Sequence, residues 1–260
     1  MYIYEIIQPG TFLEAEDQGD KWELENIIRN LVDQFYDANL ALNLFIDSYK
    51  RGHNPPSAEQ WQTDSKRRSE IRREVKLKYN NPHDHAVWHE IHLQTEITFK
   101  KEQWQSGKLP RQFEHNQSFI YARAFLYALD SFDKFFGVLK KQSNVPSELE
   151  EIYIKFGREF SDLRGVRNSA QHMEDRSRGL GAGINPKPLK LKPIDNGFIK
   201  SEGGIIALNC LNGTKYGNTM ADGHYGEVDV SPQSMEALSV ILQDILEAFK
   251  WTGGEMHFPN

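Results

Sequence analysis

The fold is decided by residues 119–139, FIYARAFLYALDSFDKFFGVL, the most apolar stretch of the chain with helical spacing. It predicts a helix from about Arg111 to Lys141 whose apolar side chains cover most of the circumference. Because a helix that is apolar nearly all round needs neighbours on several sides, it should lie centrally in a helical bundle.

On the N-terminal side the sequence predicts three more helices and, over residues 1–7, a short strand or an apolar arm. The first helix spans about Asp20 to Lys50, and the second runs from Ser57 to about Tyr79. Asn81 is a good helix cap and Pro82 suits a first helical position, so the third helix is expected from there to about Gln105.

On the C-terminal side, Ser147-x-x-Glu150 resembles a capping box that opens a helix reaching about Arg176. Glycines and prolines then predict a loop over 177–204. A β-hairpin follows around Asn212-Gly213, and the alternation over 225–230 predicts a further strand. Ser231-Pro232 opens a last helix, which should end near 253–254.

The expected fold is therefore mainly α, a helical bundle with a small antiparallel β-hairpin inserted before the last helix. We expect an N-terminal helical region over 1–108, packed on a helical domain over 109–260. The loop and hairpin insertion occupies about 177–230 of that domain.

Composition narrows the class of protein. The net charge of −6 does not suggest a general nucleic-acid coat, although a local basic patch is compatible with it. Cys210 is the one cysteine, which favours a reducing compartment and a packed strand residue rather than a nucleophile. No apolar run approaches the roughly 20 residues of a membrane span, and the first residues do not read as a signal peptide. A cytoplasmic protein is expected.

The candidate site is the run Arg164-Gly-Val-Arg167-Asn168-Ser-Ala-Gln-His172. On an ideal helix Arg164, Asn168 and His172 form one stripe opposite the apolar face, and Arg167 lies at the border. The Asn168 amide is close enough to orient the imidazole. Histidine titrates near neutral pH, and the arginine fork suits phosphate oxygens. These residue types fit attack on an RNA phosphodiester by the internal 2′-hydroxyl, without a metal.

Arg167-Asn168-Ser-Ala-Gln-His172, near the end of a helix in a helical bundle, resembles the Arg-x4–6-His motif of the HEPN superfamily. The resemblance covers about residue 111 to the last helix. It implies a homodimer whose paired motifs meet at the interface, and a metal-independent endoribonuclease without a cofactor, often a toxin or antiviral defence effector. Arg167 would bind the scissile phosphate, His172 would be the acid or base, and Asn168 would keep the site polar.

Other interpretations of the motif stay open. The resemblance also covers catalytically inactive modules that bind nucleic acid, a protein partner or an antitoxin. Alternatively, the helix face is merely solvated, with Arg164 and Arg167 paired to nearby acids. Arg167 lies about 140° from His172 on an ideal helix, so the two converge only through a frayed helix end, the reach of arginine or a second subunit.

Three further groups of residues have candidate roles. Lys187 and Lys190, with Lys192, are expected to steer a phosphate chain or to solubilise the loop. His85, His89 and His92, with His83 nearby, have spacing that suits zinc ligands, although a histidine-rich polar face is favoured. The basic run Lys66 to Lys78, beside Trp61, would contact an RNA backbone, but Glu70 and Glu74 favour a salt-bridged surface.

Overall fold

The computed structural model describes residues 1–14, 18–52, 57–82 and 84–260. The chain is mainly helical with small antiparallel strand pairs and sheets, which confirms the predicted fold class. It divides into two compact units, one formed by residues 1–47 and 118–260 and the other by 48–117. The predicted domains, 1–108 and 109–260, stay a prediction.

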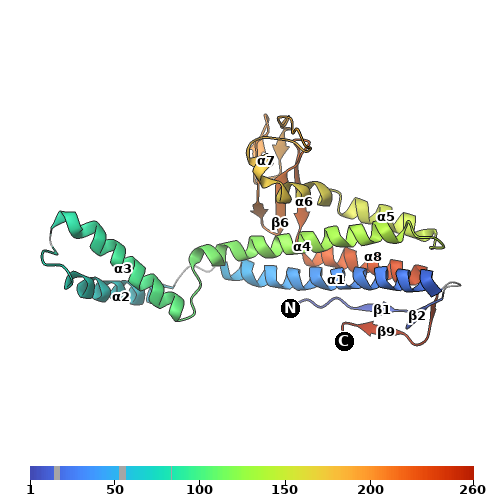
Figure 1. Cartoon of the computed structure of the whole chain (residues 1–260), viewed down its shortest axis with the longest axis horizontal. Coiled ribbons are helices and arrows are strands. Elements are labelled where there is room, and N and C mark those ends of the chain that lie inside the picture. Colours follow the sequence, from blue (N-terminus) through green and yellow to red (C-terminus); the bar gives the residue numbers. More distant parts are fainter. Residues whose placement is uncertain (15–17, 53–56, 83) are drawn as a thin grey trace. The chain divides into compact units, whose positions relative to one another are not determined.

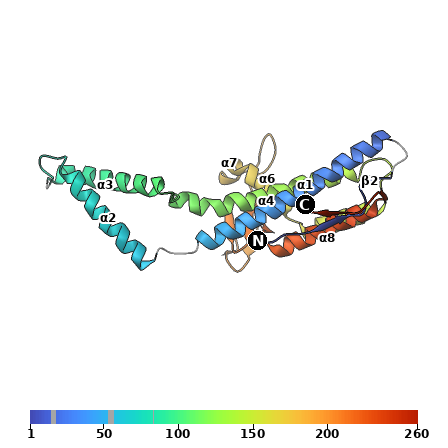
Figure 2. The same cartoon turned by 90° about the horizontal axis from the view of Figure 1, so that it is seen from below.

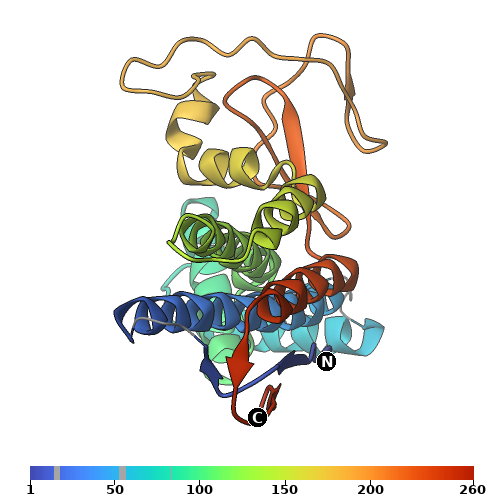
Figure 3. The same ribbon diagram turned by 90° about the vertical axis from the view of Figure 1, so that its right-hand side faces the viewer.

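The larger unit is a bundle built around α4 (Arg111–Leu139), of which residues 118–139 belong to this unit. Helices α1 (Gln18–Gly52, as far as Asp47) and α8 (Pro232–Ala248) lie on one side of α4 (Figures 1 and 3). Helix α5 (Glu148–Glu159) packs against α4 through stacked rings of Phe132 and Phe156, 5.7 Å apart. The central position expected for the apolar helix follows from these contacts.

Helix α4 is nevertheless not buried all round. Its core side includes Phe125, Leu129 and Phe132, which are fully buried, whereas Ile120 and Val138 are about half exposed. One acid, Asp130, is also buried on this helix. The apolar composition alone therefore overstated how completely the helix is enclosed.

Strands from the two ends of the sequence form antiparallel pairs beside the bundle (Figure 1). Strand β1 (Ile6–Gln8) is antiparallel to β9 (Met256–Phe258), and β2 (Phe12–Leu13) is antiparallel to β8 (Trp251–Thr252). The prediction that the last helix continues to 253–254 is wrong. The helix ends at Ala248 because Phe249 is extended, and the Trp251 indole then donates to the Leu246 carbonyl.

The β element before α8 is a three-stranded antiparallel sheet in the order β5-β6-β7, formed by Cys210–Asn212, Lys215–Thr219 and Tyr225–Asp229. The predicted turn at Asn212-Gly213 is confirmed, with Gly213 at a φ of 61°. The prediction of a loop over all of 177–204 is corrected by a small pair, β3 (Ile194–Asp195) and β4 (Lys200–Ser201). Asn196 forms this turn by accepting from two backbone N–H groups.

The smaller unit is a helical hairpin of α2 (Ala58–Lys76) and α3 (His85–Gln105), seen again in Figure 2. Its small core consists of Ile71, Val75, Ile91 and Phe99, with Tyr79 and Val87 packed against it. Ser57 caps α2 as predicted. The prediction that α3 starts at Asn81-Pro82 is wrong, because the Asp84 carboxylate accepts from the Ala86 N–H and caps the helix there.

We expect Phe132→Ala to lower the free energy of unfolding by about 3–5 kcal/mol, since it removes a fully buried ring and leaves a cavity between α4 and α5. Ile120→Ala, at a half-exposed position of the same helix, should cost less than about 1 kcal/mol. Urea unfolding followed by circular dichroism measures both values. Equal losses for the two variants would contradict the proposed position of the core.

Candidate active site around α6

The predicted motif helix from 146 to 176 is corrected by two breaks. The chain forms α5, then α6 (Leu163–Gln171) and α7 (Met173–Ser177). Both breaks have a backbone outside the helical region, at Phe160 (φ −114°, ψ 47°) and His172 (φ −117°, ψ 42°). The first break buries the Phe160 ring against Phe156. As a result, the motif lies on a short separate helix that ends at His172.

The predicted capping box at the start of α5 is also wrong. Ser147 has a helical backbone conformation, and its side chain makes no capping hydrogen bond. The hydroxyl instead contacts the neighbouring Glu148 carboxylate at 3.3 Å. Three acids in the first turn of α5 favour the helix start electrostatically without a box.

One side of α6 packs on the three-stranded sheet. Val166 is fully buried, and its carbonyl accepts from the buried Asn218 side chain of β6 at 3.4 Å. At the start of the helix the Asp162 carboxylate accepts from the Glu227 N–H of β7. A Cβ at Gly165 would collide with the Met220 sulfur, so glycine allows this close approach. These contacts fix the position of α6 over the sheet.

The opposite anchor of α6 is a buried ion pair to α4. The Arg167 Nη2 lies 2.6 Å from the Asp130 Oδ2, and the two side chains are only 13% and 7% exposed. The Arg167 Nη1 donates to the side-chain oxygens of Asn168 and Gln171, at 2.9 and 2.7 Å. Its Nε is buried without a hydrogen-bond partner among the described residues. Arg167 is thus firmly oriented, toward the bundle, with one donor unsatisfied.

Asp130 is ionised in this arrangement. Burial acts to raise the pKa of the carboxyl, but hydrogen bonds from Arg167 and Lys134 outweigh it, so the pKa lies below its ordinary value. The Lys134 ammonium is 2.7 Å from the same Asp130 oxygen. Asp130 was not among the residues predicted for the site. The signal that could have identified it is an acid within the strongly apolar stretch 119–139.

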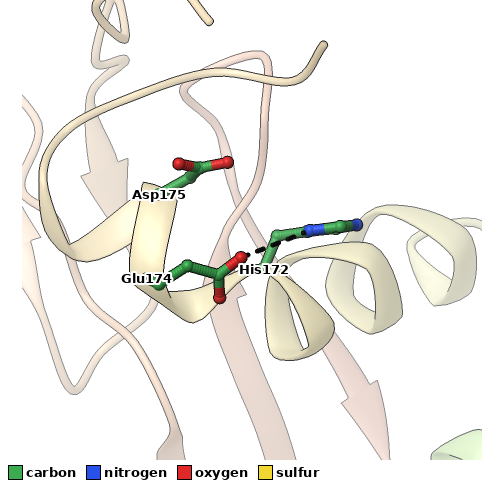
Figure 4. Close-up of side chains that lie close together, drawn as sticks. All are labelled: His172, Glu174 and Asp175. Atoms are coloured by element: carbon green, nitrogen blue, oxygen red, sulfur yellow. Dashed lines mark ion pairs between the residues drawn. The ribbon is translucent and has the colours of Figure 1, made fainter. Parts of the chain in front are cut away.

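His172 lies on the solvent side, at the end of α6 (Figure 4). Its imidazole is 57% exposed, and its Nδ1 is 3.6 Å from the Glu174 carboxylate. His172, Glu174 and Asp175 have ligand atoms within 4.8 Å of one another, but Asp175 is already paired with Arg178 at 2.6 Å. The Glu174 carboxylate therefore faces the imidazole, and the two acids place negative charge beside His172 that would repel a phosphate.

The predicted stripe is present only in part. Arg164 is exposed like His172, and Asn168 is half-buried between them. The Asn168 amide oxygen accepts from Arg167 instead of orienting the imidazole. The structure thus brings Arg167 and Asn168 together against α4 and leaves Arg164 and His172 facing solvent.

Lys187 and Lys190 are exposed on the loop that follows α7. The loop folds back on itself, because the Gly181 N–H donates to the Lys187 carbonyl. Arg176, which the sequence analysis missed, is fully buried and donates to the carbonyls of Leu180 and Gly181, both at 2.7 Å. This buried arginine therefore fixes the start of the loop that carries the two lysines.

The described histidines of α3 contact aromatic rings rather than further potential metal ligands. The His92 ring stacks on Trp88, and the His89 ring meets the same indole edge-on. Within the described ranges, the one group of three or more potential ligands that lie together is the group at His172. His83 lies outside the described residues.

Comparison of the chain with protein-family models, curated proteins and solved structures gave no match. In the part of the chain that the structure describes, every helix is too short or too polar to cross a membrane.

We expect Asp130→Asn to lower the free energy of unfolding by about 3 kcal/mol at pH 7, because it leaves the buried Arg167 charge without a counterion. The pKa of Asp130 is lower in the folded protein than in the unfolded chain. Its contribution to stability is therefore fully present at a pH above the unfolded-state pKa, and it is lost as the pH falls through the folded-state pKa. The difference in the free energy of unfolding between wild type and Asp130→Asn, measured by urea titration, should therefore decrease toward pH 3.

Asp195→Asn is the control, since Asp195 forms an exposed pair with Lys200. It should change stability by less than about 1 kcal/mol at either pH. A destabilisation by Asp130→Asn that stays constant from pH 7 to pH 3 would refute the ionised pair.

Proposed function

We propose that the chain is a HEPN-like, metal-independent endoribonuclease that acts as a homodimer. The observation that carries the proposal is the division of α6 into a side anchored by buried contacts and a side exposed to solvent. Buried contacts of Arg167 and Val166 fix the helix, whereas Arg164 and, at the end of the helix, His172 are exposed. The Arg-x4-His spacing that resembles the HEPN motif supports the assignment of the family.

In the proposed reaction the 2′-hydroxyl of RNA attacks the adjacent phosphorus, and the bond to the 5′-oxygen breaks. The His172 imidazole accepts the 2′-hydroxyl proton as general base, or protonates the leaving oxygen as general acid. Guanidinium groups stabilise the charge that develops on the phosphate oxygens. Arg167 is the candidate for this role, with Arg164, Lys187 and Lys190 binding the flanking phosphates.

A second subunit is part of the proposal for a geometric reason. In one chain the Arg167 guanidinium faces Asp130, whereas the His172 imidazole faces solvent. A two-fold axis beside α6 would bring His172 of one chain toward Arg167 of the other, since such an interface places each motif against its copy. The buried Nε of Arg167, which has no hydrogen-bond partner in the described part of the chain, is compatible with a side chain that rearranges when substrate binds.

The second candidate is a catalytically inactive HEPN-like module that binds a partner. Two observations favour it: the ion pair that engages Arg167, and the acids Glu174 and Asp175 beside His172. A role as a toxin or defence effector in the cytoplasm, with an antitoxin as partner, belongs to the first candidate and follows from the resemblance.

We expect His172→Ala to reduce cleavage of single-stranded RNA by about 10²- to 10⁴-fold, the usual contribution of a general acid or base. His172 is exposed, so the variant should fold normally. His257→Ala, which alters another exposed histidine beside a glutamate, is the matched control and should retain activity. EDTA should have no effect. Purified dimer that never cleaves RNA would favour the inactive module instead.

Mixed dimers test whether the site is shared. Arg167→Ala and His172→Ala homodimers should both be inactive, but random exchange of their subunits should restore about a quarter of the activity. Half of the dimers are then heterodimers. If each site combines Arg167 of one chain with His172 of the other, every heterodimer has one intact site and one site that lacks both residues. Circular dichroism verifies the folding of both variants. If every mixture stays inactive while the subunits exchange, the composite site is excluded.

A further inference from the structure

The two compact units differ in charge. The hairpin unit, residues 48–117, has 13 lysines and arginines against 9 acids, a net charge of +4. The rest of the chain has 18 basic and 28 acidic residues, a net charge of −10. Six of the nine histidines and three of the five tryptophans also lie in the hairpin unit. An overall acidic chain thus concentrates its basic side chains, histidines and tryptophans in one small unit.

Part of the basic run on α2 holds the hairpin together. Arg67 forms a two-bond pair with Glu102, and Arg68 is 3.2 Å from Glu96. The Arg68 guanidinium also lies over the ring of the buried Phe99, 3.8 Å from its centroid. For these two arginines, the salt-bridged surface considered in the sequence analysis is the correct interpretation.

The other cations of the run are different. The remaining cations of the run are Lys66, Arg72, Arg73, Lys76 and Lys78. None of them has a carboxylate partner within 4 Å among the described residues. Arg72 and Arg73 are exposed. Arg72 and Lys76 are four residues apart on one helix face, where unpaired like charges repel each other. An anion bound between them would relieve that repulsion.

Aromatic rings lie beside these cations. The Arg72 Nη2 is 3.3 Å from the His92 Nδ1, and the His92 ring stacks on Trp88 with an interplanar angle of 10°. Trp88 is 52% exposed. The pairs Arg68–Glu96 and Arg72–His92 set an antiparallel register that places Lys76 level with Trp88. Cations from α2 and flat rings from α3 therefore share one seam of the hairpin.

We propose that this seam binds single-stranded nucleic acid, with phosphates on Arg72, Arg73 and Lys76 and an unpaired base stacked against Trp88. Charge complementarity argues for a polyanion, and exposed aromatic rings beside cations are the usual platform for unpaired bases. An acidic protein would satisfy the cations but would leave the exposed part of the Trp88 indole without a stacking partner of its own. The proposal concerns binding alone and does not depend on cleavage at His172.

The test measures the affinity of the full chain for labelled oligouridine and oligothymidine of about 12 nucleotides, by anisotropy over a series of salt concentrations. The His172→Ala background keeps RNA intact. The triple variant Arg72→Gln, Arg73→Gln, Lys76→Gln should weaken binding at least about tenfold and reduce the salt slope by about 2, since each phosphate contact contributes about 0.7.

Two further variants separate stacking from charge. Trp88→Ala should weaken binding about tenfold with the salt slope unchanged, because stacking of one base contributes about 1–3 kcal/mol. Trp88→Phe should retain most of the affinity. The matched control is the triple variant Lys141→Gln, Arg158→Gln, Lys250→Gln, which removes three exposed cations from the other unit and should change affinity less than about twofold.

Four results would overturn the proposal. The first is no binding of either oligonucleotide, and the second is an equal loss of affinity in the two triple variants. The third is duplex binding as tight as single-strand binding with no effect of Trp88→Ala. The fourth is competition by polyglutamate at the same charge concentration as oligouridine, which would identify the seam as a surface for acidic proteins.

Discussion

The ion pair between Arg167 and Asp130 is the interaction on which the motif depends. It crosses from α6 to α4 between side chains that are almost fully buried. Burying two charges is expensive, and the cost is recovered only with good geometry and further hydrogen bonds. Lys134 supplies a second contact to Asp130, and Asn168 with Gln171 supplies two for Arg167. The pair therefore determines which side of α6 faces the bundle and leaves His172 to solvent.

The sequence predicted the long helices well, because hydrophobic spacing and end signals agreed there. Ser57 and Ser231-Pro232 open helices as expected. The breaks at Phe160 and His172 could not be predicted from periodicity, since Leu149, Phe156, Leu163 and Val166 keep a helical rhythm across the first break. Tertiary contacts cause it: Phe160 enters the core, and Asp162 meets the backbone of β7.

Residue types and spacing were enough to choose the candidate residues, but they did not predict how the side chains are oriented. Residue types and spacing selected Arg164, Arg167, Asn168 and His172. The partner that positions Arg167 is 37 residues away on another helix, and no local pattern links Asp130 to the motif. The same limit applies to the basic run of α2, where contacts with α3 decide which of the described arginines pair with a carboxylate.

The position of the hairpin unit in the sequence also affects how the protein folds. Residues 48–117 interrupt the larger unit, whose segments 1–47 and 118–260 must find each other across that separation. The hairpin has mainly local contacts, so it can form early, whereas the bundle has the high contact order of a slow folder. Because the entropy of loop closure grows with loop length, a hairpin that is already folded shortens the flexible chain and lowers the barrier to joining α1 and α4.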